Sequence, residues 1–424
     1  MQLVIHHVDA AGVPQCGAYD DLSLANPVLV VLADYASPTA RAQSLALFAA
    51  LDRELRDAMG ATPVEPPCGG SRPAIGDCQM RSDAAADKVL VLVGDTVSAS
   101  PPEITALSDD WAAATSGHSI LPLFPLDARP SLSRLLPPSA RHANAVFWQR
   151  RPDEALPALF ARAGISAEQP RLFISYRQVD SAALAIQLFD AFSHEGFDVF
   201  LDHFRIPPGA NFQARLTQEL GDKSMVLLLE SEHLGESEWV AHEIGIAKSC
   251  GLGLLGLLLP RGRRQPSLDE GNRDALIDDD FEGGRFTSET RLTADALGRV
   301  VAGVRTRHDR TLVARRKMLE QSFEGALARE GCAASRIGNG AIEVRSAGRE
   351  YRVWLTSRPP EMPDFHRAHG AVSPPTTGVL VGLSRLMEPA HHERTAWLAD
   401  LCRLELADEG QLSDVARAIA AGTL

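Results

Sequence analysis

The sequence predicts an α/β fold built around parallel sheets. Short apolar runs rich in β-branched residues, such as residues 27–32 and 89–93, are typical of strands buried on both faces. Helix-spaced apolar residues follow such runs, as in residues 40–59 and 239–250. Strand–helix alternation of this kind implies right-handed crossovers and a parallel, flavodoxin-like sheet.

Three domains are expected within the 424 residues. A polar stretch that ends in a proline, residues 164–170, predicts a first joint. A second joint is expected near residues 306–310, where a helical pattern gives way to charged residues. The predicted domains are a flavodoxin-like α/β domain over residues 1–165, a better defined α/β domain over residues 170–306 and a small α+β domain over residues 310–424.

Each domain has its own series of expected elements. In the first, strands are predicted at residues 27–32, 89–93, 120–124 and 145–148, helices at 40–59, 104–115 and 154–163, and a long loop at 60–87. In the second, strands are predicted at 172–175, 198–202, 225–229 and 252–259, and helices at 182–195, 212–220, 239–250 and 294–304. In the third, helices are predicted at 312–329, 393–404 and 412–420, and strands at 341–346, 351–355 and 378–383.

Composition excludes several classes of protein. A net charge of −13 argues against a dedicated nucleic-acid binder, which would carry a basic face. The longest apolar run, residues 251–259, is far shorter than the ~20 residues that span a bilayer, and no secretory signal opens the chain. The six cysteines are scattered without a CxxC pair, so we expect reduced thiols in a cytoplasmic protein that does not enter a membrane.

Three motifs lie where strands of the middle segment meet loops and helices. FISYR, residues 173–177, ends the first strand at the carboxyl edge of the sheet, where ligands of open α/β sheets bind. GFDVFLD, residues 196–202, leads the second strand into a loop that contains two prolines and a glycine at residues 207–209. SEWVAHE, residues 237–243, opens a helix in which Trp239 and Glu243 share one face.

Together these motifs resemble the Toll/interleukin-1 receptor (TIR) domain over about residues 170–305. FISYR is similar to the first strand of that family, GFDVFLD to its second strand and RIPPGANF to its BB loop. SEWVAHEIGIAKSCG is similar to the family's WxxxE helix, and DALIDDDFEGG to its late strand and acidic loop. The ordered set is particularly similar to the enzymatic branch, which includes the animal axon-degeneration NADase and bacterial anti-phage TIR effectors.

The resemblance implies an NAD+ glycohydrolase. In the enzymatic branch the glutamate of the WxxxE helix is catalytic, and here it falls on Glu243. Breaking the nicotinamide–ribose bond passes through an oxocarbenium-like transition state, which a positioned carboxylate stabilises. Nicotinamide is already a cationic leaving group, so no general acid is needed. The expected products are nicotinamide and ADP-ribose, or a cyclic ADP-ribose, with NAD+ as substrate and no other cofactor.

Further residues are assigned to the NAD+ site. Tyr176 and Arg177 are expected to contact the ring and the diphosphate, and Trp239 to pack on the substrate. Because the chain is acidic, Arg177 and Arg205 are expected to supply local positive charge for this anionic substrate. The full predicted set is Ser175, Tyr176, Arg177, Asp202, Arg205, Trp239 and the catalytic Glu243.

Alternatives remain open at several of these positions. Trp239 and Glu243 can instead be a core anchor and a solvated charge, and residues 207–209 can form a plain turn. The chain would then be a non-enzymatic TIR scaffold that signals by self-assembly. In either case the family's BB loop implies homo-oligomers formed through TIR–TIR contacts. For the enzyme, the resemblance also implies an unidentified trigger ligand or protein and a role in bacterial anti-phage defence.

The flanking segments are expected to lack catalysis. Aligning SGHSI, residues 116–120, with residues 249–253 places Asp110 where Glu243 stands. It places Ala106 where Trp239 stands, and no FISYR equivalent occurs in the first segment. That segment is therefore expected to be TIR-like or flavodoxin-like without NADase activity, or a generic βα repeat. No metal site is expected, because the paired histidines lack a cysteine or acidic ligand pattern.

Overall fold

The computed structural model describes residues 1–424 except 67–78, 82, 84, 115–117, 166–169, 202–211, 235–237, 338–339 and 388. Of residues 58, 79, 212–216, 238 and 239 it describes the backbone alone. The described chain divides into two compact units, which are Met1–Glu168 with Ile337–Gly340 and Gln169–Arg336 with Ala341–Leu424.

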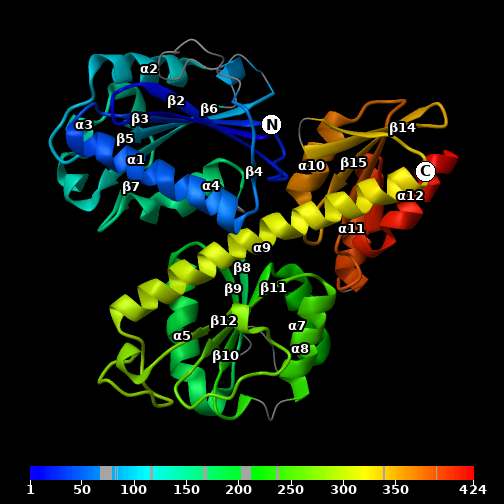
Figure 1. Cartoon of the computed structure of the whole chain (residues 1–424). Coiled ribbons are helices and arrows are strands. Elements are labelled where there is room, and N and C mark those ends of the chain that lie inside the picture. The colour runs from blue at the N-terminus through cyan, green and yellow to red at the C-terminus, as the bar shows by residue number, and fades with distance from the viewer. Residues whose placement is uncertain are drawn as a thin grey trace. The chain divides into compact units, whose positions relative to one another are not determined.

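The first unit contains a mixed β-sheet flanked by helices (Figure 1). Its described strands lie in the order β4-β2-β1-β3-β5-β6-β7. β1, β3, β5, β6 and β7 run parallel, whereas β2 is antiparallel to β1 and to β4. The strands are β1 (Leu3–Val8), β2 (Pro14–Asp20), β3 (Val28–Asp34), β4 (Thr62–Pro63), β5 (Asp87–Val93), β6 (His118–Pro125) and β7 (Val146–Trp148). The α-helices described here are α1 (Pro38–Arg53), α2 (Pro102–Ala113), α3 (Leu132–Leu135) and α4 (Leu156–Arg162).

The sheet of residues 1–165 is mixed and not all parallel as predicted. Strand β2, which the sequence pattern did not predict, is antiparallel to β1 and pairs with the edge of β1 that faces away from β3. The parallel strands follow one another in chain order from β1 to β7.

Cys16 in β2 is disulfide-bonded, which corrects the expectation that all six cysteines are reduced. A disulfide requires two sulfurs that are close in space, and scattered sequence spacing does not report this distance. Cys250, Cys332 and Cys402 are free thiols. The cysteines therefore give no support to a reducing compartment.

The second unit begins with a parallel sheet that has the predicted flavodoxin-like order. Its described strands lie in the order β12-β11-β10-β8-β9, and each neighbouring pair is parallel. The strands are β8 (Arg171–Ser175), β9 (Asp198–Leu201), β10 (Met225–Glu230), β11 (Gly253–Leu258) and β12 (Arg273–Ala275). The helices are α5 (Gln178–His194), α7 (Phe212–Asp222), α8 (Glu238–Ser249) and α9 (Ala294–Arg329).

Alternate residues of β8 pack against helices on opposite faces of this sheet. Leu172 and Ile174 belong to the apolar cluster that includes residues of α5 and α9. Phe173 belongs to the cluster that includes residues of α7 and α8. Because side chains alternate along a strand, Ser175 lies on the same face as Phe173, which is the face covered by α8.

A second sheet completes the unit, with described strands in the order β13-β14-β15-β16-β17. β14 and β15 are antiparallel, whereas β15, β16 and β17 run parallel. The strands are β13 (Ala334–Ile337), β14 (Ala341–Ser346), β15 (Arg349–Leu355), β16 (Thr377–Gly382) and β17 (Leu404–Asp408). The helices are α10 (Met362–Ala371), α11 (Pro389–Cys402) and α12 (Leu412–Ala421), of which α12 packs with the end of α9 on the sheet.

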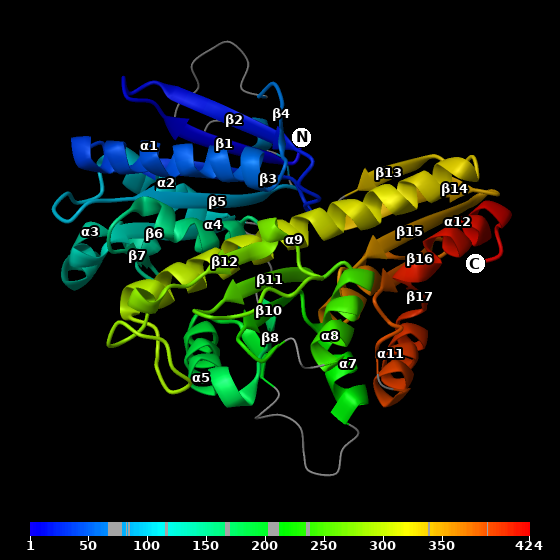
Figure 2. The same cartoon turned by 60° about the horizontal axis from the view of Figure 1, so that its bottom comes forward.

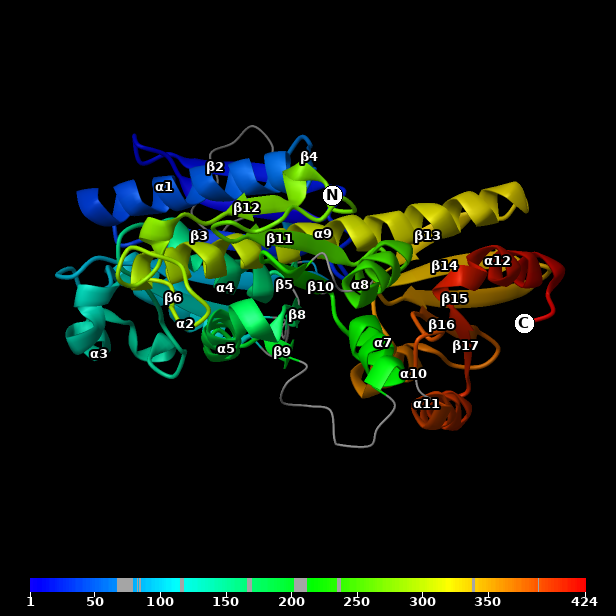
Figure 3. The same cartoon turned by 90° about the horizontal axis from the view of Figure 1, so that it is seen from below.

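Helix α9 runs unbroken through the predicted joint at residues 306–310 (Figure 2). Val300 and Val304 pack in the core of the first sheet of this unit, and Phe323 packs in the core of the second. Figure 3 shows the ribbon of α9 extending from β11 and β12 to β14 and β15. The charged stretch contains no proline or glycine, and Arg307 makes two hydrogen bonds of 2.7 Å to Asp274. The expectation of two separate helices is therefore wrong. No helix in the described part of the chain, α9 included, has the length and apolar character needed to cross a bilayer.

A buried ion pair crosses β11 near the carboxyl edge of the sheet. Glu230 at the end of β10 accepts hydrogen bonds of 2.6 and 3.0 Å from Arg273 in β12. The two side chains are 0% and 4% exposed, and the hydrogen bonds raise the pKa of Arg273. Gly256 in β11 leaves room for this pair, because a Cβ there would lie 2.8 Å from Glu230 Oε2 and 2.4 Å from Leu268 Cδ2.

Gly256→Ala should lower the free energy of unfolding by about 2–4 kcal/mol, because the added methyl group displaces a buried ion pair. Urea denaturation of the whole chain measures this loss. Gly271→Ala is the matched control, since a Cβ added there would meet no atom within 4 Å. Equal stability of the two variants would contradict this role for Gly256.

Candidate functional site

The chain reverses its direction across the sheet between β8 and β10. From β8 the chain passes through α5 to β9, on one side of the pair, and from β10 through α8 to β11, on the other side. The carboxyl ends of β8 and β10 therefore form the topological switch point of this parallel sheet. Ligands of open α/β sheets bind outside the carboxyl ends of the strands at such a point.

Ser175 and Glu243 meet at this switch point. Ser175 is the last residue of β8 and lies opposite Leu228 of β10 in the sheet register. Its Oγ donates a hydrogen bond of 2.5 Å to Oε2 of Glu243. Both residues are only 4% exposed. A buried carboxylate without a hydrogen-bond donor is costly, so this bond is a condition for keeping Glu243 at the sheet edge.

Glu243 lies on the sheet-facing side of α8. Val240 and Ile244 of this helix pack with Leu228, and Ala247 packs in the cluster that contains Phe173. These positions and Glu243 share helical spacing, which directs all of them to one face. The solvated charge considered as an alternative for Glu243 is therefore excluded by its burial.

Tyr176 and Arg177 follow β8, and Tyr176 packs on the face opposite to Glu243. Tyr176 is half-buried and packs against the apolar cluster that includes α5 and α9. Arg177 is half-buried and occupies the position before the first turn of α5. The structure therefore brings Ser175 and Glu243 into contact and places Tyr176 toward the opposite helix layer.

Asp180 in the first turn of α5 is hydrogen-bonded to His233 in the loop after β10. Asp180 Oδ2 accepts hydrogen bonds from the backbone N–H of His233, at 3.0 Å, and from its Nδ1, at 3.2 Å. Ser181 Oγ donates to the carbonyl oxygen of Arg177 at 3.0 Å. These contacts fix the backbone beside Arg177, and no motif in the sequence pointed to them.

Several predicted site residues lie outside the described residues. These are Asp202, Arg205 and the loop residues 207–209, together with the side chain of Trp239. Within the described ranges, no group of three histidine, cysteine, aspartate or glutamate side chains is placed to hold a metal ion.

The first unit has no counterpart of the buried glutamate at the aligned position. Asp110 has a side chain that is 67% exposed and pairs with Arg81 on the surface. The neighbouring Trp111, 1% exposed, fills the core instead. At the carboxyl edge of this sheet, Asp95 accepts hydrogen bonds from Ser37 and Ser98, which supports the loops there.

Comparison with known families identifies the region that contains this site. Residues 172–283 match the family model described as TIR domain. The match begins in β8 and ends after β12, so it includes both Ser175 and Glu243. No curated protein sequence matches the chain.

Ser175→Ala should destabilise the protein by about 1–3 kcal/mol, because it removes a hydrogen-bond donor from a buried carboxylate. Ser193→Ala, at an exposed position of α5, is the control and should change stability by less than about 0.5 kcal/mol. Chemical denaturation monitored by circular dichroism measures both values. A loss no larger than that of the control would mean that the Ser175 hydrogen bond does not support Glu243.

Proposed function

Because residues 172–283 form a TIR domain, we propose that this domain cleaves NAD+ at the nicotinamide–ribose bond. Glu243 is the catalytic carboxylate in this proposal. The observation that carries it is the burial of Glu243 at the switch point, where Ser175 holds one of its oxygens. The resemblance of SEWVAHE to the family's WxxxE helix supports the same assignment.

A single buried carboxylate is sufficient for this chemistry. The nicotinamide nitrogen takes the electron pair of the broken bond and leaves as a neutral ring, so no proton has to be supplied. Positive charge develops on the ribose, and a carboxylate stabilises it more strongly in a site that excludes water. Water then attacks the anomeric carbon and releases one proton, which gives ADP-ribose. Attack by the adenine ring of the same molecule gives a cyclic product instead.

The diphosphate of NAD+ is assigned to the start of α5. The chain is acidic overall, so the substrate needs a local source of positive charge. Arg177 precedes α5, whose backbone is kinked at Ser181, and its guanidinium is the charge assigned to the diphosphate. The contacts of Asp180 and Ser181 hold the backbone at this position. Asp202, Arg205 and Trp239 are assigned to the same NAD+ site, and Tyr176 is assigned to its edge, because Tyr176 packs toward α5 and α9.

We also propose that TIR–TIR contacts between copies of the chain activate the enzyme in bacterial anti-phage defence in the cytoplasm, after an unidentified trigger. The resemblance to the enzymatic branch supports this part of the proposal.

A non-enzymatic TIR scaffold is the second candidate. It is favoured by the same hydrogen bond, because a glutamate that is buried and bonded to Ser175 also fits a structural role in the core. In that case self-assembly alone would carry the signal, and NAD+ would not be consumed.

Nicotinamide release from NAD+, followed across a range of protein concentrations, separates the two candidates. The unaltered chain should release nicotinamide with a specific activity that rises with concentration. Glu243→Ala should lose at least about 100-fold, because a charge-stabilising group of the transition state is removed. Glu393→Ala, at an exposed position of α11, is the control and should retain activity. Undiminished release by Glu243→Ala contradicts the assignment, and assembly without release at any concentration supports the scaffold.

A further inference from the structure

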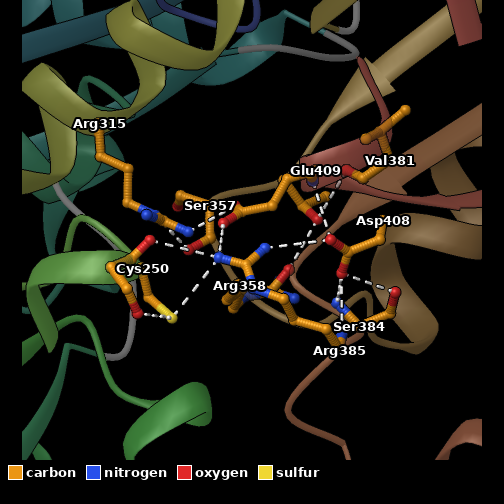
Figure 4. Close-up of polar contacts among 12 residues, drawn as sticks. Cys250, Arg315, Ser357, Arg358, Val381, Ser384, Arg385, Asp408 and Glu409 are labelled. Carbon is orange, nitrogen blue, oxygen red and sulfur yellow. Dashed lines mark hydrogen bonds and ion pairs between the residues drawn. The ribbon is translucent and has the colours of Figure 1, made fainter. Parts of the chain in front are cut away.

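The carboxyl end of α8, the helix that carries Glu243, is held by residues that follow β16 (Figure 4). Arg385 donates a hydrogen bond of 3.4 Å from Nη2 to the carbonyl oxygen of Ser249, and the same nitrogen lies 3.7 Å from Cys250 Sγ. The last carbonyl groups of a helix lack partners within the helix, and a cation near them is stabilising. Leu383 adds an apolar contact, since it packs in the cluster that contains Ala247 and Cys250.

Arg385 is itself fixed by carboxylates at the end of β17. Its Nη1 donates to Asp408 Oδ1 at 3.0 Å, and its Nη2 lies 3.3 Å from Glu409 Oε1. Burial alone would raise the pKa of Asp408, but hydrogen bonds from backbone N–H groups, including that of Gly410, lower it overall. Asp408 is therefore an ionised partner for Arg385 near neutral pH.

The same network reaches α9. Glu409 accepts a hydrogen bond of 2.5 Å from Arg315, and Arg315 also donates to the carbonyl oxygen of Ser357 at 2.9 Å. The side chains of Arg315 and Glu409 are only 3% and 7% exposed. Ser357 and Glu409 follow the carboxyl ends of β15 and β17, at an edge where open sheets bind ligands. Here that edge holds α8.

Two further contacts attach the sheet of β8–β12 to the C-terminal domain, which consists of the second sheet, β13–β17, and helices α10–α12. A Cβ at Gly221 in α7 would lie 2.7 Å from Leu386 Cβ, so only a glycine allows this close approach. Arg171 at the start of β8 pairs with Asp222 at 2.5 Å and with Glu361. The strand that ends in Ser175 and the helix that carries Glu243 are therefore both braced by the C-terminal domain.

We propose that Arg385 is a positioning residue for Glu243. By holding the carboxyl end of α8, it sets the position of the Glu243 carboxylate relative to Ser175 at the end of β8. This inference rests on the proposed function and adds a role for the C-terminal domain, which becomes a support that controls the rate of bond cleavage. A displacement on the order of 1 Å at a catalytic group is enough to slow a reaction by as much as about 100-fold.

The first test compares Arg385→Ala with Arg394→Ala, which removes an exposed arginine of α11 in the same domain. Arg385→Ala should lower kcat for nicotinamide release about tenfold and change KM by less than about twofold, because substrate contacts remain while Glu243 is displaced. Arg394→Ala should leave both values within about twofold. Arg385→Lys should restore part of kcat, since an ammonium keeps a positive charge near the last carbonyl groups of α8. An unchanged kcat in a folded Arg385→Ala variant overturns the proposal.

Gly221→Ala tests the same support by a steric route that leaves every charge in place. Alanine is the better helix former, but its Cβ would push Leu386 away from the end of α7. We expect a lower kcat for Gly221→Ala and an unchanged kcat for Gly298→Ala, whose Cβ in α9 would meet no atom within 4 Å. Equal kcat values for these two variants count against the proposal even if Arg385→Ala fails to fold.

Hydrogen exchange of the amides in residues 246–250 gives a readout that does not depend on activity. Arg385→Ala should raise their exchange rates about tenfold relative to the unaltered chain, because the end of α8 opens more often. Unchanged exchange overturns the role of Arg385 whether or not the chain is an enzyme. Absence of nicotinamide release from the unaltered chain overturns the proposed function instead, and exchange then decides alone whether Arg385 holds α8.

Discussion

The hydrogen bond from Ser175 to Glu243 joins the two elements on which the site depends. A carboxylate is stable in a dry interior only when donors surround it, so its position is tied to the strand end that supplies the hydroxyl. The alternation of β8 sends Ser175 to the face covered by α8, and the helical spacing of Val240 and Ile244 turns Glu243 toward the same place. In the proposed function, the switch point between β8 and β10 determines where NAD+ meets this carboxylate.

The rest of the second unit keeps these two elements in place. Helix α9 contributes residues to the apolar cores of both sheets, so it connects the sheet of β8–β12 to the C-terminal sheet. Arg385 contacts the end of α8, and Arg171 ties the beginning of β8 to Asp222 and Glu361. The contact between Ser175 and Glu243 is therefore stabilised by residues at the far ends of β8 and α8, the two elements that carry them.

Much of the TIR sheet could be predicted from sequence, because its strands are short apolar runs and its motifs occur in a fixed order. The motifs assigned Ser175 and Glu243 to one predicted NAD+ site, and the structure adds that their side chains are hydrogen-bonded. Strand β1 contains His6 and His7, and β2 contains a proline and a glycine, so neither shows a clear strand pattern. The charged stretch at residues 306–310 led to a prediction of two helices in place of α9. In the structure Arg307 of this stretch is paired with Asp274, which is distant in sequence. The contact of Arg385 with Ser249 spans 136 positions and leaves no local signal. Long-range pairing of this kind depends on the folded structure alone.

In the proposed function, Glu243 acts on the bond-breaking step of NAD+ cleavage. Binding and cleavage measured in one sample of Glu243→Gln test it most directly, because the amide preserves the shape of the side chain and still accepts a hydrogen bond from Ser175. We predict that this variant binds NAD+ within about threefold of the unaltered chain and releases nicotinamide at least about 100-fold more slowly in a single turnover. Cleavage by Glu243→Gln at the rate of the unaltered chain would show that the Glu243 carboxylate takes no part in breaking the bond.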